Sequence, residues 1–174
     1  MKQILFVDCC IRRELSRTKK LADAALAALG TRDDIAVTEL CLMDEPLQYF
    51  SEGFFAQRER LLAAKELDHP RFRYAHQFAE ADAIVIAAPF WDLAFPALLK
   101  VYIENVSVEG ITFGCNASGC FGICRAERML FLTTRGGSYD GAPDEMGARY
   151  LEALCGFFGI PRFDCVAADG LDLG

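Results

Sequence analysis

The chain has 174 residues, the length of one domain with a single core of ordinary size, and we expect residues 1–174 to form that domain. Apolar residues make up 53% and charged residues 25%, a composition typical of globular and not of disordered proteins. The net charge of −7 argues against nucleic acid and anionic membrane surfaces as partners, because both attract clustered lysine and arginine.

The start of the chain does not predict a targeting segment. The apolar run Ile4–Val7 is too short for the core of a signal peptide and meets an acid at Asp8. No stretch approaches the roughly 20 apolar residues of a membrane span. We therefore expect a cytoplasmic protein whose eight cysteines are thiols and not a disulfide framework; they stand at positions 9, 10, 41, 115, 120, 124, 155 and 165.

Apolar patterns alternate along the chain between short strand-like runs and longer helical runs. In chain order they predict a strand at Lys2–Val7, a helix at Thr18–Leu29, a strand at Ile35–Cys41, helices at Gly53–Lys65 and Pro70–Ala81, a strand at Ala83–Ala88, a helix at Pro96–Val108, a long loop at Gly114–Arg125, a strand at Met129–Thr134, a helix at Pro143–Phe158 and a strand at Phe163–Ala168.

Strands that alternate with helices predict a parallel sheet with helices on both faces. The segment Ala83–Ala88 is apolar throughout, as buried parallel strands are. Five strands and right-handed crossovers favour the order 2-1-3-4-5 in a three-layer α/β sandwich. Because ligands bind beyond the carboxyl ends of such strands, the loops that follow them are the candidate site.

The first of these loops, Asp8–Thr18, lacks the G-x-G-x-x-G pattern of dinucleotide sites. Ser16 and Thr18 stand at the start of the next helix, where hydroxyls, backbone N–H groups and the helix dipole can form a phosphate site. Five basic residues add to it: Arg12, Arg13, Arg17, Lys19 and Lys20. The alternative is that Ser16 only caps the helix and that the charges only solvate it.

The second loop, Phe90–Leu93, places Asp92 among aromatic residues, between two prolines. This composition suits a flat, hydrogen-bonding ligand such as a flavin; packing in the core, with one capping carboxylate, is the alternative. The third loop, Thr133–Tyr139, has two glycines that let the backbone approach a ligand closely, and a simple turn is the alternative.

Together the three loops resemble those of the FMN-dependent NADH azoreductase and quinone reductase family, which has a flavodoxin-like fold. The segments Pro96–Ile103 and Gly110–Phe113 resemble a signature stretch of that family, and the segments Tyr150–Ile160 and Ala168–Leu171 resemble its tail. The similarity covers essentially the whole chain.

The resemblance implies FMN as cofactor and NADH or NADPH as co-substrate. It assigns the FMN phosphate to the first loop, the isoalloxazine ring to the second and the other edge of the ring to the third. By position, the binding residues are Cys10, Ser16, Arg17 and Thr18, then Phe90, Trp91, Asp92 and Leu93, then Thr134, Arg135, Gly136 and Gly137.

The implied activity is ping-pong transfer of two electrons from NAD(P)H to a quinone, azo or nitro compound, with the chemistry supplied by the flavin. Asp92, Tyr139 or water could supply protons to the acceptor, whereas His69 and His76 are expected at the surface or in helices away from the loops.

The resemblance also implies a homodimer with the flavin pocket at its interface. The aromatic pairs at 49–50 and 54–55 could cover a partner's pocket or pack in the core.

Two residues depart from the family within these loops. Cys10 stands where serine is common, which removes a hydroxyl donor that Arg17 could replace by binding phosphate in a bidentate manner. Asp92 stands where the family has asparagine, and an ionised carboxylate only accepts hydrogen bonds. We expect Asp92 either to accept from the flavin N3–H or to repel the anionic reduced flavin and lower its reduction potential.

The segment Gly114–Cys124 departs further because it holds Cys115, Cys120 and Cys124. The spacing C-x4-C-x3-C fits no zinc or iron–sulfur motif and offers three ligands, so we expect inert or redox-sensitive thiols and no metal. Two alternatives to a reductase remain open for the whole chain. One is a flavodoxin-type electron carrier, and the other is a thiol-based redox sensor in which Cys10 and Asp92 weaken flavin binding.

Overall fold

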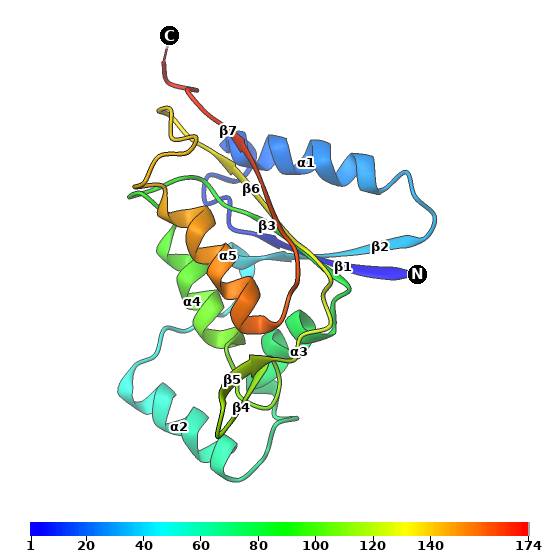
Figure 1. Cartoon of the computed structure of the whole chain (residues 1–174), viewed down its shortest axis with the longest axis vertical. Helices are drawn as coiled ribbons and strands as arrows, with labels where there is room; N and C mark the ends of the chain where they lie inside the picture. Colours follow the sequence, from blue (N-terminus) through cyan, green and yellow to red (C-terminus); the bar gives the residue numbers. More distant parts are fainter. Residues whose placement is uncertain (174) are drawn as a thin grey trace.

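The computed structural model describes residues 1–173 and contains a five-stranded sheet and a separate two-stranded hairpin (Figure 1). The strands of the large sheet are β1 (Lys2–Asp8), β2 (Ile35–Cys41), β3 (Ala83–Ala87), β6 (Met129–Thr134) and β7 (Phe163–Ala168). They pair in the order β2-β1-β3-β6-β7, and every pairing is parallel. This is the predicted order 2-1-3-4-5, because β4 and β5 lie outside the large sheet.

Five α-helices connect these strands. They are α1 (Arg17–Leu29), α2 (Glu52–Ala63), α3 (Arg73–Glu80), α4 (Ala97–Val106) and α5 (Met146–Phe158), with short 3-10 turns η1 (Arg13–Leu15), η2 (Leu42–Asp44) and η3 (Pro70–Phe72). The predicted helix at Pro70–Ala81 thus divides into η3 and α3. The helix predicted from Pro143 begins three residues later, because the Glu145 carboxylate caps α5 by accepting the N–H of Ala148.

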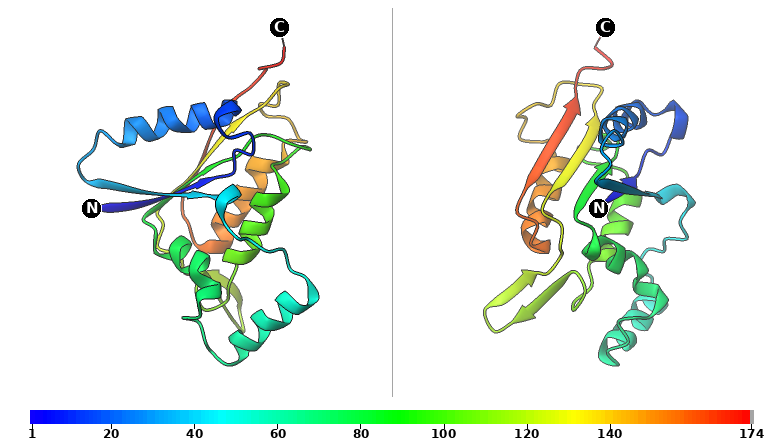
Figure 2. Two further views of the ribbon diagram at one scale, coloured as in Figure 1. Left: turned by 180° about the vertical axis from the view of Figure 1, so that it is seen from behind. Right: turned by 90° about the vertical axis from the view of Figure 1, so that its right-hand side faces the viewer.

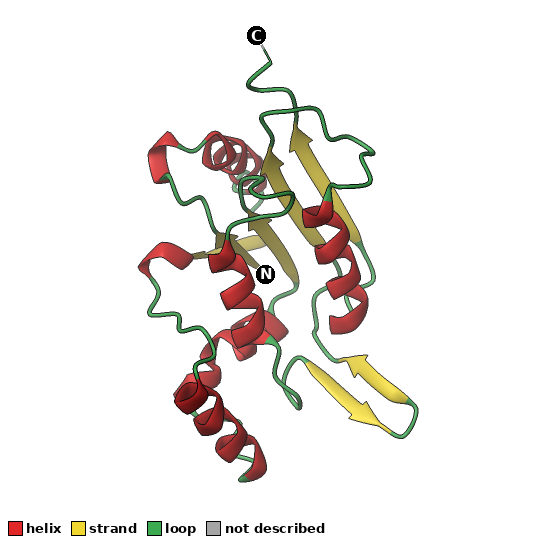
Figure 3. Cartoon of the chain, turned by 90° about the vertical axis from the view of Figure 1, so that its left-hand side faces the viewer, coloured by secondary structure: helices red, strands yellow, loops and turns green. Residues whose placement is uncertain are grey.

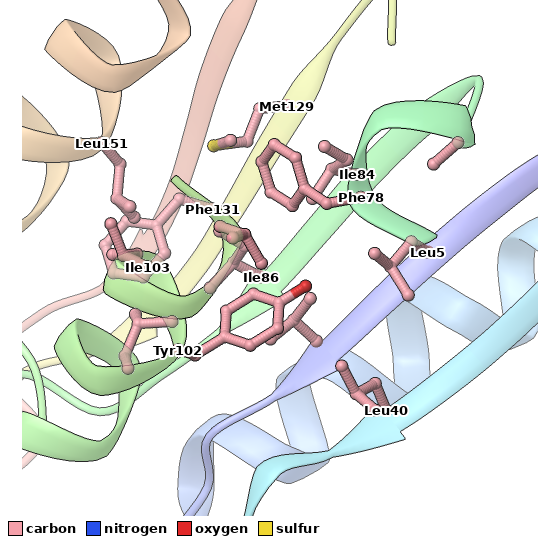
Figure 4. Close-up of a cluster of buried hydrophobic side chains, with 14 of the residues drawn as sticks. Leu5, Leu40, Phe78, Ile84, Ile86, Tyr102, Ile103, Met129, Phe131 and Leu151 are labelled. Carbon is pink, nitrogen blue, oxygen red and sulfur yellow. The ribbon is translucent and has the colours of Figure 1, made fainter. Parts of the chain in front are cut away.

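Side chains alternate between the two faces of the sheet and sort the core into two layers. On one face Leu5, Ile84 and Phe131 pack against α3, α4 and α5 (Figure 4). On the other face Phe6 and Val85 pack against α1. The prediction of a three-layer sandwich is therefore confirmed.

The prediction of a long loop at Gly114–Arg125 is wrong. Strands β4 (Phe113–Asn116) and β5 (Gly119–Gly122) form an antiparallel hairpin there. Gly114 pairs with Phe121, whose ring lies 2.9 Å from the place where a Cβ on Gly114 would stand. The hairpin could not be predicted from the sequence, because its many glycines and cysteines leave no alternation of apolar and polar side chains.

The prediction that all the cysteines are thiols is wrong for two of them. Cys115 and Cys120 face each other across the hairpin and form a disulfide. The remaining six cysteines are free, which agrees with the prediction. The C-x4-C-x3-C spacing therefore contains a bonded pair and one separate thiol, Cys124, whose pKa burial raises to about 12.

The hairpin and α2 lie at the end of the molecule opposite to the C-terminus (Figures 2 and 3). The carboxyl ends of β6 and β7 point toward the C-terminal end, so the loops after the strands are remote from the disulfide. Within residues 1–173, the longest helices have 13 residues, and none is long and apolar enough to cross a membrane.

Candidate functional site

The loops that follow β1, β3 and β6 meet around a cavity of about 260 Å³. Seven of the residues predicted for the site line it: Ser16, Arg17, Thr18, Phe90, Trp91, Thr134 and Gly136. Arg12, Pro89 and Asp172 also line it, of which Pro89 and Asp172 were not predicted. Arg12 belongs to the basic group in the first loop, whereas only folding brings Asp172 to this place.

The N-terminus of α1 supplies hydrogen-bond donors to this cavity. The buried Ser16 side chain caps the helix by accepting the N–H of Lys19 at 3.3 Å. The first intrahelical bond runs from the N–H of Lys20 to the carbonyl oxygen of Ser16, so the N–H groups of Arg17 and Thr18 have no partner within the helix. The positive end of the helix dipole adds to these donors, and the arrangement favours an anion.

Thr18 joins the first loop to the third. Its hydroxyl oxygen lies 2.6 Å from the hydroxyl oxygen of Thr134, and Thr18 is fully buried. The first and third loops are therefore held together at the base of the cavity by a hydrogen bond between two side chains that the sequence places in the site.

The second loop is a tight turn with unusual backbone geometry. Trp91 and Ala94 exchange backbone hydrogen bonds, and the two residues between them, Asp92 and Leu93, have φ of 50° and 66°. Two consecutive left-handed residues are the geometry of a type I′ turn, in which asparagine and aspartate are favoured and leucine is strained. The turn carries Trp91, 41% exposed, at the mouth of the cavity, while Asp92 points to solvent.

Cys10 lies beneath the first loop and does not line the cavity. It is fully buried, and its sulfur lies 3.8 Å from the carbonyl oxygen of Ala87. Burial, together with a hydrogen bond to Asp8, raises the pKa of the Cys10 thiol far above its usual range. At this position the thiol packs behind the loop and presents no donor to a ligand.

Arg135 also points away from the cavity, although the family resemblance implies a ligand contact for it. Its guanidinium is 5% exposed and pairs with Glu145 at 3.4 Å and with Asp169 at 3.2 Å. Asp169 in turn accepts the N–H of Tyr139 at 2.8 Å. Arg135 therefore holds the third loop against α5 and the end of β7, and Gly136 is the part of this loop that reaches the cavity.

A larger cavity of about 990 Å³ lies on the other side of this ion group, along β7 and the start of α5. Tyr139 lines this larger cavity and Phe90 lines the smaller one, and their ring centroids are 4.5 Å apart. The two rings form the wall between the cavities. We place the candidate site in the smaller cavity because the helix donors, hydroxyls and cation converge there.

The two histidines have structural partners elsewhere. The His69 ring accepts the N–H of Arg71 at the start of η3, and the His76 ring lies 2.9 Å from the carbonyl oxygen of Leu67. Both lie away from the three loops, as predicted.

A five-stranded parallel sheet of order 2-1-3-4-5, with a candidate site in the loops at its carboxyl edge, defines the class of flavodoxin-like α/β proteins. The chain belongs to the family described as Flavodoxin-like fold, whose model matches residues 2–174.

Similar proteins support the predicted resemblance. An FMN-dependent NADH:quinone oxidoreductase of Clostridium perfringens is 37% identical over 176 residues, which cover 99% of this chain and 88% of the relative. FMN-dependent NADH:quinone oxidoreductase 2 of Clostridium acetobutylicum is 36% identical over 181 residues, with the same coverage.

Among solved structures, an azoreductase from Bacillus anthracis is 29% identical, with a TM-score of 0.88, over 99% of this chain and 89% of that one. An FMN-dependent NADH-azoreductase from the same species, solved with FMN, has a TM-score of 0.89 over 100% and 90% of the two chains; at 20% identity it shows the fold alone.

Proposed function

We propose that this chain is an FMN-dependent NAD(P)H oxidoreductase that transfers two electrons to quinone or azo acceptors. The relatives named for NADH:quinone oxidoreduction and the azoreductase structures support this proposal. The observation in the structure that carries it is the meeting of the α1 N-terminus with Phe90 and Trp91 around one cavity. An anion site beside an aromatic site is what a phosphorylated flavin requires.

The chemistry of the donors fits the two ends of FMN. At the phosphate end, the N–H groups of Arg17 and Thr18, the Ser16 side chain and two arginines supply donors and positive charge. At the ring end, Phe90 and Trp91 supply flat apolar surface, and Gly136 lets backbone approach. We propose the phosphate for the first loop and the ring for the second and third, with Cys10 and Arg135 in supporting positions behind them.

FMN, when bound, supplies the hydride chemistry, accepting from NAD(P)H and donating to the oxidised substrate. The protein binds the flavin, orients it and shields it from water. Trp91 and Leu93, both more than 40% exposed, offer apolar surface at the mouth for flat molecules. The wall of Phe90 and Tyr139 separates this region from the larger open cavity. Because donor and acceptor would use the same mouth in turn, we expect ping-pong kinetics. We retain Asp92 and Tyr139 as candidate proton sources for the acceptor.

We further propose that residues 1–174 act as a single FMN-binding domain and that the enzyme is a cytoplasmic homodimer. Several apolar side chains are exposed around the mouth, and the backbone N–H of Met146 bonds to the carbonyl oxygen of Leu93, so Met146 belongs to the same surface. A second copy would cover it. Tyr49 and Phe55, 71% and 44% exposed, offer further apolar surface to a partner. Six of the eight cysteines are free thiols, as is usual in a reducing compartment, although Cys115 and Cys120 form a disulfide.

The test is the visible spectrum of the FMN-loaded protein under anaerobic conditions, before and after addition of NADH and then NADPH. Rapid bleaching of the flavin band is the expected result, and it identifies the preferred nucleotide. Bound flavin that neither nucleotide reduces would instead establish an electron carrier. Failure to retain flavin would overturn the proposal and favour the thiol-based redox sensor.

A further inference from the structure

The segment after β7 folds back along the third loop. Gly170 donates its N–H to the carbonyl oxygen of Gly137 at 2.9 Å, and Asp172 donates its N–H to that of Gly136 at 3.0 Å. These bonds place residues 170–172 beside the mouth of the candidate site, near the C-terminus at the top of Figure 2. As a result the side chain of Asp172 forms part of the cavity wall.

The same segment binds the cation that the proposed function assigns to the phosphate. Arg17 Nη1 donates to Asp172 Oδ1 at 2.8 Å and to the carbonyl oxygen of Leu171 at 3.0 Å. The guanidinium holds the pKa of the Asp172 carboxyl below its usual range, so the pair is ionised at neutral pH. One nitrogen of the Arg17 guanidinium, Nη1, is therefore already bound by a carboxylate and a carbonyl oxygen of the chain itself.

Gly136 makes room for this carboxylate. A Cβ at Gly136 would lie 2.2 Å from Asp172 Oδ2, so a larger residue there would displace the carboxylate from the third loop. The carboxylate of Asp172 thus forms part of the wall of the 260 Å³ cavity, beside Arg17.

We propose that Asp172 competes with the cofactor phosphate for Arg17. Asp172 thereby weakens the preference of the site for phosphorylated over unphosphorylated flavin. This inference rests on the proposed function. A phosphate monoester carries about −1.5 to −2 charges at pH 7 and is repelled by a carboxylate beside the same cation. In this proposal the phosphate of FMN takes the Arg17 donor from the Asp172 carboxylate, while the backbone bonds of residues 170–172 to the third loop remain. Riboflavin, which has no phosphate, gains nothing from this exchange.

The test compares the dissociation constants of FMN and riboflavin, from quenching of flavin fluorescence, for the unmodified protein and for Asp172→Asn. We expect the variant to bind FMN about three- to tenfold more tightly and riboflavin within twofold of the unmodified protein. The control is Asp164→Asn, which removes the same charge from an exposed residue of β7 that pairs with Arg128. Equal tightening for both flavins would overturn the inference, because it would mean only that space had been opened. Weaker FMN binding would also overturn it, since Asp172 would then position Arg17 for the phosphate.

A second comparison removes the cation. In an Arg17→Gln background, Asp172→Asn should no longer improve FMN binding beyond the effect of Asp164→Asn, and a retained improvement would contradict competition for Arg17. If no variant binds either flavin, the proposed function fails. The competition for Arg17 is then tested with inorganic phosphate alone, by its effect on the melting temperature. Phosphate should raise the melting temperature of Asp172→Asn more than that of the unmodified protein, and an equal rise would overturn it.

Discussion

The hydroxyl groups of Thr18 and Thr134 lie 2.6 Å apart although 116 positions of sequence separate them. Thr18 stands in the first turn of α1 and Thr134 at the end of β6, so one hydrogen bond joins the two loops on either side of the cavity. Both side chains are buried, and each hydroxyl depends on the other.

The first prediction follows from this pair. Thr18→Val leaves the Thr134 hydroxyl buried without its partner and should lower the free energy of unfolding by about 1–3 kcal/mol. The double variant Thr18→Val/Thr134→Val removes both hydroxyls and should be less destabilised than the sum of the single variants. Urea unfolding of the four proteins of this cycle measures the coupling, and additive losses would show that the hydroxyls act independently.

The turn that carries Trp91 should become more stable when its strain is relieved. Leu93 has φ of 66°, a conformation that glycine adopts at no steric cost. We expect Leu93→Gly to raise the free energy of unfolding by about 1 kcal/mol, measured by urea unfolding. Leu93→Ala is the matched control, because it loses the same exposed side chain and keeps the strain. If both variants change stability equally, backbone geometry is not the cause.

Asp92 should tune the reduction potential of the bound flavin. Its exposed carboxylate disfavours additional negative charge, so Asp92→Asn should raise the potential by about 10–20 mV, from a surface electrostatic effect of about 1 kcal/mol. Equilibration with a reference dye measures the change. Asp140→Asn is the control, an exposed acid that lines the larger cavity. Equal potentials for the Asp92→Asn variant and the unmodified protein would remove this role.

The ion group around Arg135 should be essential for stability. Glu145→Gln removes one carboxylate from a guanidinium that is 5% exposed and weakens the cap of α5. We expect a loss of about 3 kcal/mol in the free energy of unfolding, because a buried charge is left with one partner. Asp144→Asn, at the exposed neighbouring residue, should change stability by less than about 0.5 kcal/mol. A loss no larger than that of the control would refute the role of Arg135 as the support of the third loop.

The hairpin disulfide should contribute to stability without affecting the site. Cys115 and Cys120 are separated by five positions, and closing so short a loop stabilises a protein by about 2 kcal/mol. The double variant Cys115→Ser/Cys120→Ser should therefore unfold at lower urea concentration and bind FMN as before, since the hairpin lies at the opposite end from the loops. A changed FMN affinity would show that the hairpin acts on the flavin site.

Much of this architecture could be predicted from local patterns. The apolar segment Ala83–Ala88 identified a buried parallel strand, and its alternation with helices led to the strand order, because a parallel connection needs a crossover and crossovers have one hand. Ser16 at the start of a basic helix predicted an anion site, which stays a prediction, and its capping of α1 is confirmed.

Other features depended on contacts between distant residues. The hairpin at 113–122 escaped prediction because it is stabilised by a cross-strand disulfide, by Phe121 over Gly114 and by packing of Gly122 against the end of α5, none of which leaves a periodic pattern. Arg135 was assigned to the ligand by the family resemblance, and only folding brings Glu145 and Asp169 to its buried guanidinium.

The same distinction separates Arg17 from Asp172. Arg17 was predicted for the site from the basic first loop and the family resemblance, whereas Asp172 lies beside Arg17 because residues 170–172 bond to the third loop. The sequence by itself determined the sheet, its order and the three loops, because these follow from short-range periodicity and chain geometry. The tertiary structure alone decided which side chains face the cavity and which charge already occupies Arg17, because those depend on contacts across more than a hundred residues.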